Sequence, residues 1–487
     1  MKSNGEYSGI LHHVTPQTSN RIIMKRTVLV SISLFTFFFS FSQQQNKISY
    51  KQLKEYEGVY DYAGHLKVSF AASPKDTALL AIINQSEYVL KNESPDVFST
   101  SYDTIHFFRD AHNLPAGYIS KKETFKLVSK NVFFPETMWY PRLKGKDVYQ
   151  YEIPENLNDG LIVGNINKTV LDTTLLREMM QKIINGTYPN VHSVLIIKDG
   201  KLVFEQYFYQ YTKDSVQEMR SASKSVFSAL AGIAIDKGFI KSKNETVLSF
   251  FPEYTLSNMS DAKKRITVEN LLTQQTGLDC DISNPKSEGN ETTMDYSDDW
   301  VKFTLDLPVI DTPGGKGMYC SGNPITLGRI VEKTTKMAFL QFAKKNLFEP
   351  LGFRNYQWYF KPDKSNAENY CQVYLTPREM SKFGLMYLNN GIWNGKQIVS
   401  SYWVTQSFEK HSVIQGIDYG YLWWLKYLDA DGIRYYTKAA QGNGGQRIYI
   451  MKEQNMVTVI TGGNYNSQSP SDELMTKFIL PAFNKKK

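Results

Sequence analysis

The chain has 487 residues, too many for one ordinary domain and enough for a large core plus an accessory domain. Hydrophobic residues make up 41% and charged residues 21% of the sequence, which is usual for a globular protein and excludes a disordered or fibrous chain. The formal charge of +8 falls to +5 without residues 1–42. Because no Lys/Arg cluster lies among aromatic residues, no nucleic-acid partner is expected.

An export signal is predicted near the N-terminus. Basic residues 25–26 precede an apolar run of about 15 residues, 27–41, which is shorter than the roughly 20 residues that span a bilayer. We therefore expect residues 1–42 to be a leader that is removed, and the mature protein to be periplasmic or secreted without a stable membrane span. An uncleaved anchor is the alternative, and translation starts at either Met1 or Met24.

A small β-rich accessory domain is predicted over residues 43–155. Runs rich in aromatic and β-branched residues, such as 66–70 and 105–108, lie between turn formers, which is typical of strands. A connector rich in Pro, Asn and Gly, residues 151–167, leads to the second predicted domain, residues 160–487.

The second domain is predicted to have strands at both ends and helices between them. Two apolar runs flank Asp199-Gly200, a pair that indicates a two-residue hairpin turn. Residues 446–451 and 456–461 are predicted to pair as strands, and residues 471–480 to form a closing helix. This order predicts an α+β fold, in which one antiparallel sheet is flanked by helices with a helical lobe, preceded by the small all-β domain.

Ser221 and Lys224 form the first candidate catalytic motif. They stand at the start of an apolar helical pattern, and the spacing of three residues puts hydroxyl and amine on one helix face. A lysine with a lowered pKa could then take the serine proton. The same spacing recurs at 260/263, 283/286 and 407/410, where no apolar helix follows and solvated side chains are expected.

Tyr319 and Ser321 belong to a second motif, which precedes another helical pattern. A tyrosine hydroxyl near the nucleophile can relay its proton to a leaving group, although a tyrosine taken alone is more often a core residue. The third motif is Gly442-Asn443-Gly444-Gly445-Gln446 at the start of a strand. There the N–H of Gln446, or alternatively of Gly445, could form an oxyanion hole with the Ser221 N–H; a plain turn is the competing interpretation.

The order of these motifs resembles the class C β-lactamase-like serine hydrolases, which include penicillin-binding enzymes, family VIII carboxylesterases and 6-aminohexanoate-dimer hydrolases. The likeness covers roughly residues 190–465. Within this range, further segments that look like the family are 267–273, 276–278, 347–352, 375–380 and 419–424. It implies a β-lactamase/transpeptidase-like fold and an acyl-enzyme on Ser221, with Lys224 and Tyr319 as partners and Gly444, Gly445, Gln446 and Ser321 around the substrate.

Two departures from the family pattern bear on the substrate. Asn443 stands where many β-lactamases and peptidases carry a lysine or histidine, and Ser321 replaces the usual amide-bearing residue. Both changes favour a small-molecule ester or a different amide over a β-lactam. No metal or other cofactor is expected, and the sequence does not predict an oligomeric state.

Two other functions compete with the hydrolase. The first is a catalytically silent binding protein of the cell envelope that keeps the same fold. The second is a Ser-His-Asp hydrolase, for which only His192 and His411 fall in the catalytic region and no Gly-x-Ser-x-Gly segment is present.

Three cysteines, Cys280, Cys320 and Cys371, would lie in an oxidising compartment. Three cysteines can form at most one disulfide, which would leave one thiol unpaired. We expect buried free thiols and no disulfide. Their spacing is not that of metal ligands.

Overall fold

The computed structural model describes residues 48–63, 66–83, 86–100, 103–142, 148–282, 284–295, 297–360 and 371–483. The predicted leader lies outside the described residues, so it remains a prediction. From Ile48 onward the chain forms one compact unit. In the described ranges, no helix combines the length and apolar character needed to cross a bilayer.

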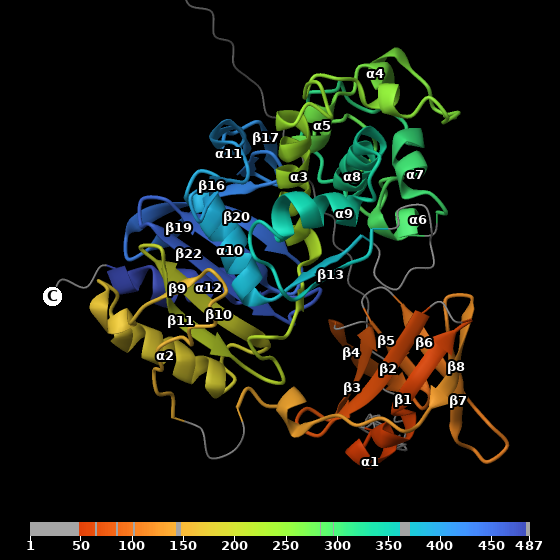
Figure 1. Ribbon diagram of the computed structural model, residues 1–487. Helices are drawn as coiled ribbons and strands as arrows, with labels where there is room; N and C mark the ends of the chain where they lie inside the picture. The colour runs from red at the N-terminus through yellow and green to blue at the C-terminus, as the bar shows by residue number, and fades with distance from the viewer. Residues whose placement is uncertain are drawn as a thin grey trace, which may run out of the picture. The chain divides into compact units, whose positions relative to one another are not determined.

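An eight-stranded antiparallel β-barrel comes first in the chain (Figure 1). Buried and exposed residues alternate along its strands, so that Ile105 and Phe107 point inward from β6. The ring of Phe70 lies 5.2 Å from that of Tyr60 and 5.1 Å from that of Phe107, and such edge-to-face contacts give the barrel its own core. The strands are β1 (Gly58–Tyr62), β2 (Leu66–Ser73), β3 (Ala78–Ile83), β4 (Ser86–Ser94), β5 (Val97–Ser99), β6 (Thr104–Arg109), β7 (Pro115–Ser120) and β8 (Glu123–Ser129), preceded by α1 (Tyr50–Leu53).

A nine-stranded sheet forms the centre of the second domain, in the order β17-β18-β19-β20-β21-β22-β10-β11-β9. Neighbouring strands are antiparallel except for β11 and β9. Asp199 and Gly200 have φ of 51° and 74° and form the predicted two-residue turn. The strands are β9 (Ile162–Val163), β10 (Val191–Lys198), β11 (Lys201–Tyr207), β17 (Ser412–Ile414), β18 (Ile417–Tyr419), β19 (Trp424–Ala430), β20 (Ile433–Gly442), β21 (Gln446–Met451) and β22 (Met456–Gly462).

Helix α10 (Pro377–Leu388) packs on β10, β21 and β22 of this sheet (Figure 1). A capping box between Thr376 and Glu379 fixes where α10 begins. A Cβ atom on Gly384 would lie only 2.7 Å from a side-chain carbon of Val457, so this glycine permits the close packing of helix and sheet. The other helices of the sheet region are α2 (Thr173–Ile184), α11 (Ser401–Ser407) and α12 (Ser471–Leu474), which a π-helical turn, Met475–Ile479, extends.

The helical lobe is built around α8 (Gly322–Thr335), against which α3, α5, α7 and α9 pack. The lobe helices are α3 (Lys224–Asp236), α4 (Asp261–Lys264), α5 (Val268–Leu272), α6 (Glu291–Asp295), α7 (Trp300–Asp306) and α9 (Phe339–Ala343). Two small sheets accompany them: β12 (Gln217–Glu218), β14 (Val373–Leu375) and β13 (Tyr356–Trp358) in one, and β15 (Ile392–Trp393) with β16 (Lys396–Gln397) in the other. The predicted α+β fold with a preceding all-β domain is confirmed.

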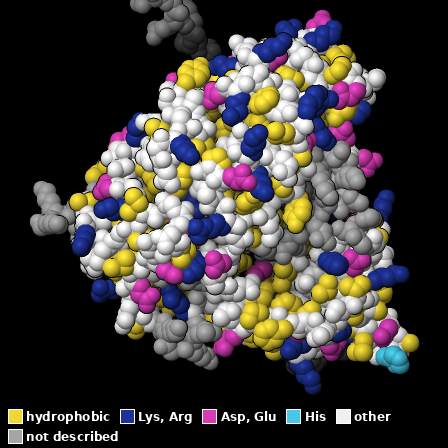
Figure 2. Space-filling model, in the orientation of Figure 1, with side chains coloured by type: hydrophobic (Ala, Val, Ile, Leu, Met, Phe, Trp, Pro, Cys, Tyr) yellow, Lys and Arg dark blue, Asp and Glu magenta, His cyan; other side chains and the backbone are white. Residues whose placement is uncertain are grey.

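On the face of the molecule drawn in Figure 2, Lys and Arg side chains are interspersed with Asp and Glu. This mixture agrees with the small net charge of the chain.

Candidate active site

The predicted nucleophile lies in a short turn between a strand and a buried helix. β12 leads into a 3₁₀ turn, Arg220–Ser223, and α3 begins directly after it. Lys224 Nζ donates a hydrogen bond to Ser221 Oγ at 2.9 Å. Ser221 is half-buried and Lys224 is 6% exposed. Hydroxyl and amine are therefore in contact, as their spacing predicted, and a proton can pass between them.

The other Ser-x-x-Lys pairs do not form such a contact in the described part of the chain. Ser260 Oγ accepts the backbone N–H of Lys263 as a helix cap. Ser407 Oγ donates to a carbonyl of its own helix, and Lys410 pairs with an aspartate. The expectation of solvated side chains is wrong for Lys263 and Ser407, both 0% exposed, because α4 and α11 turn them into the interior. Ser283 lies outside the described residues.

Tyr319 lies against the Lys224 amine. The amine nitrogen is 4.8 Å from the centroid of the tyrosine ring. The ring is 6% exposed and packs on Trp424 and, edge to face, on Tyr419, at centroid distances of 5.3 and 6.2 Å. Burial and the neighbouring Tyr319 raise the pKa of Tyr419 well above its ordinary value, so the Tyr419 hydroxyl keeps its proton. The fold thus brings the three predicted catalytic side chains together.

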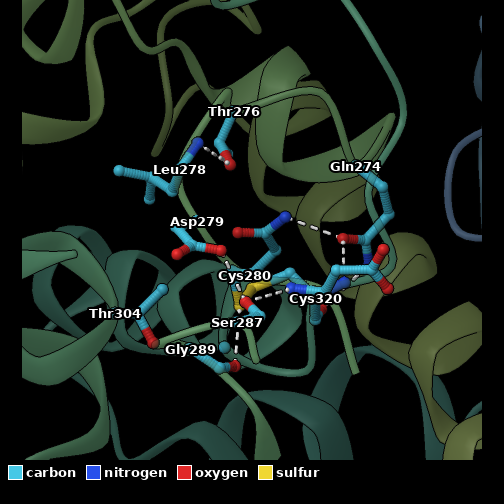
Figure 3. The surroundings of a disulfide bond; sticks show 12 residues. Gln274, Thr276, Leu278, Asp279, Cys280, Ser287, Gly289, Thr304 and Cys320 are labelled. Atoms are coloured by element: carbon cyan, nitrogen blue, oxygen red, sulfur yellow. Dashed lines mark hydrogen bonds between the residues drawn. A yellow bond between two sulfur atoms is a disulfide. The ribbon is translucent and has the colours of Figure 1, made fainter. Parts of the chain in front are cut away.

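Gln274 holds the tyrosine segment in place (Figure 3). Its Oε1 accepts hydrogen bonds from the Cys320 N–H at 3.0 Å and from Asn323 Nδ2 at 2.7 Å, and its Nε2 donates to the Cys320 carbonyl at 3.1 Å. Gln274 is fully buried, with a φ of 60° that residues other than glycine rarely adopt. The sequence analysis missed this residue, although it lies between the family-like segments 267–273 and 276–278.

A disulfide joins Cys280 to Cys320 (Figure 3), and Cys320 directly follows Tyr319 in the chain. The expectation of buried thiols is therefore wrong for this pair, while the Cys371 thiol is buried. The two cysteines are 40 residues apart, and their Cα atoms lie 5.1 Å apart. They meet because the chain after Gln274 returns along the tyrosine segment, where the Ile282 N–H donates to the Tyr319 carbonyl at 3.0 Å.

The Ser321 hydroxyl lies in the same segment and is 6% exposed. It does not cap α8, although Ser321 is the residue before that helix. Within the described residues, Ser321 Oγ has no hydrogen-bond partner.

In the third motif, Gly442 contacts the nucleophile turn. A Cβ atom on Gly442 would lie 2.2 Å from the Met219 carbonyl oxygen and 3.1 Å from the Ala222 nitrogen. Only a glycine allows the end of β20 to approach the turn this closely. Gly442 belongs to the third motif, but the sequence pattern alone did not predict this contact.

Residues 444–446, the predicted oxyanion segment, lie between the end of β20 and the start of β21. A Cβ atom on Gly444 would meet the Tyr465 ring at 2.6 Å, and one on Gly445 would meet Ser469 Oγ at 2.5 Å, so both glycines pack on the loop after β22. Gln446 pairs with Gly442 across the β20–β21 ladder, and its side chain donates to the carbonyl of Gly462 at 2.6 Å.

A family model described as Beta-lactamase matches residues 174–478, which is more than half of the chain and includes all three motifs. The chain belongs to the beta-lactamase family. Protein flp of Staphylococcus aureus (strain MW2) is 24% identical over 198 residues, and this match spans 39% of the chain and 38% of that relative.

Two solved structures share the beta-lactamase-family fold of this chain. A family VIII carboxylesterase aligns with a TM-score of 0.52 and 14% identity over 69% of this chain and 100% of that one. The octameric penicillin-binding protein homologue from Pyrococcus abyssi aligns with a TM-score of 0.50 and 18% identity over 65% of this chain and 78% of that one. The resemblance found in the sequence is thereby confirmed at the level of family and fold.

The cations near the third motif of this beta-lactamase-family domain are engaged within the protein. Asn443 Oδ1 accepts the N–H groups of Gly444 and Asn466. Lys438 Nζ lies 4.3 Å from the centroid of an aromatic ring, and burial lowers its pKa. Arg447 Nη1 donates to two backbone carbonyls of its own hairpin at 2.7 and 2.9 Å. Lys438 and Arg447 are thus both in contact with groups of the protein itself.

Both histidines of the catalytic region contact groups other than the nucleophile. His192 Nδ1 lies 2.9 Å from Gln217 Oε1, and His411 Nε2 lies 2.8 Å from the carbonyl oxygen of Gln406. The side chain bonded to Ser221 is Lys224, which argues against a Ser-His-Asp site. In the described ranges, no group of three or more His, Cys, Asp or Glu is arranged to hold a metal ion.

Proposed function

We propose that the protein is an exported serine hydrolase that cleaves an ester or amide through an acyl-enzyme on Ser221. The observation that carries this proposal is the 2.9 Å hydrogen bond between Lys224 Nζ and Ser221 Oγ, with the Tyr319 ring beside the amine. Nucleophilic catalysis by serine needs a base within hydrogen-bonding distance of the hydroxyl. Export is supported by the predicted signal in residues 1–42.

The reaction has two steps. Ser221 Oγ forms a bond to the substrate carbonyl carbon while its proton passes to Nζ of Lys224, which acts as the base. The bond to the leaving alcohol or amine then breaks, and that group takes a proton through Tyr319. Water attacks the resulting acyl ester, gives one proton back through the same groups to Ser221, and releases the acid.

The negative oxygen of the tetrahedral intermediate needs two N–H donors, and each donor is typically worth ~10²- to 10³-fold in rate. One donor is the Ser221 N–H. For the second we propose the Asn443 N–H in place of those of Gln446 and Gly445. Support comes from Gly442, the preceding residue, whose Cβ position is 3.1 Å from the Ala222 nitrogen.

The preferred substrate is an ester or amide without a carboxylate next to the scissile bond. This choice rests on the engagement of Lys438 and Arg447 by groups of the protein itself. We expect p-nitrophenyl butyrate to be hydrolysed with a higher kcat/KM than the β-lactam nitrocefin. A clear preference for nitrocefin would contradict this substrate class.

A fluorophosphonate probe distinguishes the hydrolase from a silent binding protein of the same fold. Wild type should become covalently labelled at Ser221, as seen by mass spectrometry, and Ser221→Ala and Lys224→Met should not. Ser260→Ala is the matched control. Ser260 also stands three residues before a lysine, but its hydroxyl only caps a helix. Folded wild type that resists the probe would favour the binding protein.

A further inference from the structure

The residue before the nucleophile reaches the β-barrel with its side chain. Arg220 Nη2 donates a hydrogen bond to Ser86 Oγ at 2.7 Å and another to the Tyr88 hydroxyl at 2.6 Å. Both acceptors lie on β4. The accessory barrel therefore contacts the chain at the position next to Ser221.

This contact is buried and charged. Ser86 is 0% exposed, and its Oγ donates to Glu218 Oε2 at 2.7 Å. Glu218 Oε1 in turn lies 2.9 Å from Arg220 Nε, with the glutamate side chain 3% exposed. The guanidinium also stands 5.1 Å from the centroid of the Tyr465 ring. One serine hydroxyl thus bridges a buried glutamate and an arginine whose side chain is 24% exposed, and ion pairs withdrawn from water depend on such additional hydrogen bonds.

The backbone of Arg220 is in an unfavourable conformation. Its φ of 49° lies in the left-handed region, which is unfavourable for a residue other than glycine and persists only where surrounding contacts impose it. The contacts that hold the Arg220 side chain come from Glu218, Ser86, Tyr88 and Tyr465. Arg220 is the first residue of the 3₁₀ turn that carries Ser221, so the geometry of this turn depends on the Arg220 conformation.

We propose that Ser86 and Tyr88 of the barrel are positioning residues for the nucleophile. By holding Arg220, they keep Ser221 Oγ at its distance of 2.9 Å from Lys224 Nζ. The accessory domain is then a part of the catalytic site and not only a neighbour of it. The inference rests on the proposed hydrolase function of Ser221.

The test compares rates of fluorophosphonate labelling in the full chain. Ser86→Ala/Tyr88→Phe removes both acceptors while keeping most of the packing. Because small displacements of a reacting group can cost up to ~10²-fold in rate, we expect the limiting labelling rate to fall about 10- to 100-fold. The probe concentration for half-maximal rate should stay within about twofold, since neither residue is proposed to touch the probe. If Ser86 and Tyr88 had a merely structural role, the limiting labelling rate would not fall while the probe concentration for half-maximal rate stays the same.

The matched control is Ser94→Ala/Tyr50→Phe, which removes one serine and one tyrosine hydroxyl from exposed positions of the same domain. It should label like wild type. A folded Ser86→Ala/Tyr88→Phe protein with the wild-type limiting rate overturns the inference. If that double variant does not fold, the single variant Tyr88→Phe takes its place, and a wild-type limiting rate in Tyr88→Phe likewise overturns the inference. Wild type that does not label overturns the proposed function and this inference with it, whereas a labelled wild type beside an unaffected variant overturns only the inference.

Discussion

His192 is a buried imidazole whose charge state couples stability to pH. Burial lowers its pKa from 6.5 to about 4, and the hydrogen bond to Gln217 offsets this only in part. The unfolded chain takes up the proton as the pH falls below 6.5, whereas the folded chain does so only near pH 4. The free energy of unfolding should therefore be largest above pH 6.5 and should fall by about 2 kcal/mol on this account by pH 5.

Denaturant unfolding at pH 7 and pH 5 measures this effect. His192→Asn should reduce the loss of stability between the two pH values, because the group that titrates is gone. His112→Asn removes an exposed imidazole of the barrel and serves as the control. An equal loss in wild type and His192→Asn would show that other groups cause the pH dependence.

Local spacing allowed the contact between Ser221 and Lys224 to be predicted, since side chains three residues apart at a helix start share a face. The network around Arg220 could not be predicted in this way. Ser86 and Tyr88 are more than 130 residues away in the chain, and their hydroxyls carry no pattern that marks them as partners of an arginine. Gln274 was missed for the same reason.

At the scale of elements, the contact between β20 and the nucleophile turn predicts the effect of one methyl group. Gly442→Ala would place a Cβ atom 2.2 Å from a backbone oxygen of Met219, so the strand or the turn has to move. We expect hydrolysis to fall by about 10²-fold, the cost of displacing a reacting group by roughly 1 Å. Steady-state kinetics with a nitrophenyl ester measure this loss.

Gly432→Ala is the control for that substitution. Gly432 lies in the turn between β19 and β20 with open space around its Cβ position and a φ of 75°. The variant should lose about 1 kcal/mol of stability from backbone strain but keep its kcat. Equal loss of kcat in both variants would argue against a specific role of Gly442.

The elements that the sequence predicted well are those with short-range signals. The Asp199-Gly200 turn, the strand pair β21–β22 and the closing helix after Pro470 follow from turn residues and periodicity. The closure of the barrel did not follow, because it depends on β1 pairing with β8, whose residues are distant in the chain. Strand signals predict that strands exist and leave their partners undetermined.

At the scale of the whole molecule, the disulfide between Cys280 and Cys320 should stabilise the helical lobe. It closes a loop of 40 residues, and in the chain-entropy account such a loop contributes up to about 4 kcal/mol. Cys280→Ala/Cys320→Ala should lower the midpoint of denaturant unfolding accordingly. The fluorophosphonate labelling rate should fall less than in Ser221→Ala, because Gln274 still holds the tyrosine segment. Unchanged stability in the double variant would refute a structural role of the bond.

The architecture and the three motifs were predictable because the family pattern orders them along the chain. The packing of the third motif could not be predicted in this way, since it depends on the path of the hairpin from β20 to β21. Cβ positions on Gly444 and Gly445 meet Tyr465 and Ser469 of the segment after β22, a contact that the composition of the motif does not indicate. The disulfide was also beyond prediction, because it depends on how a long loop returns.

The position of β22 in the middle of the sheet has a consequence for biosynthesis. Val194 of β10 pairs with Ile460 of β22, so one of the first strands of the domain lacks this partner until residue 460 has been synthesised. Until then the hairpin of β10 and β11 exposes an apolar edge that can pair with other chains. Shielding of that edge by a holding chaperone until β22 has been synthesised should therefore raise the yield of soluble protein.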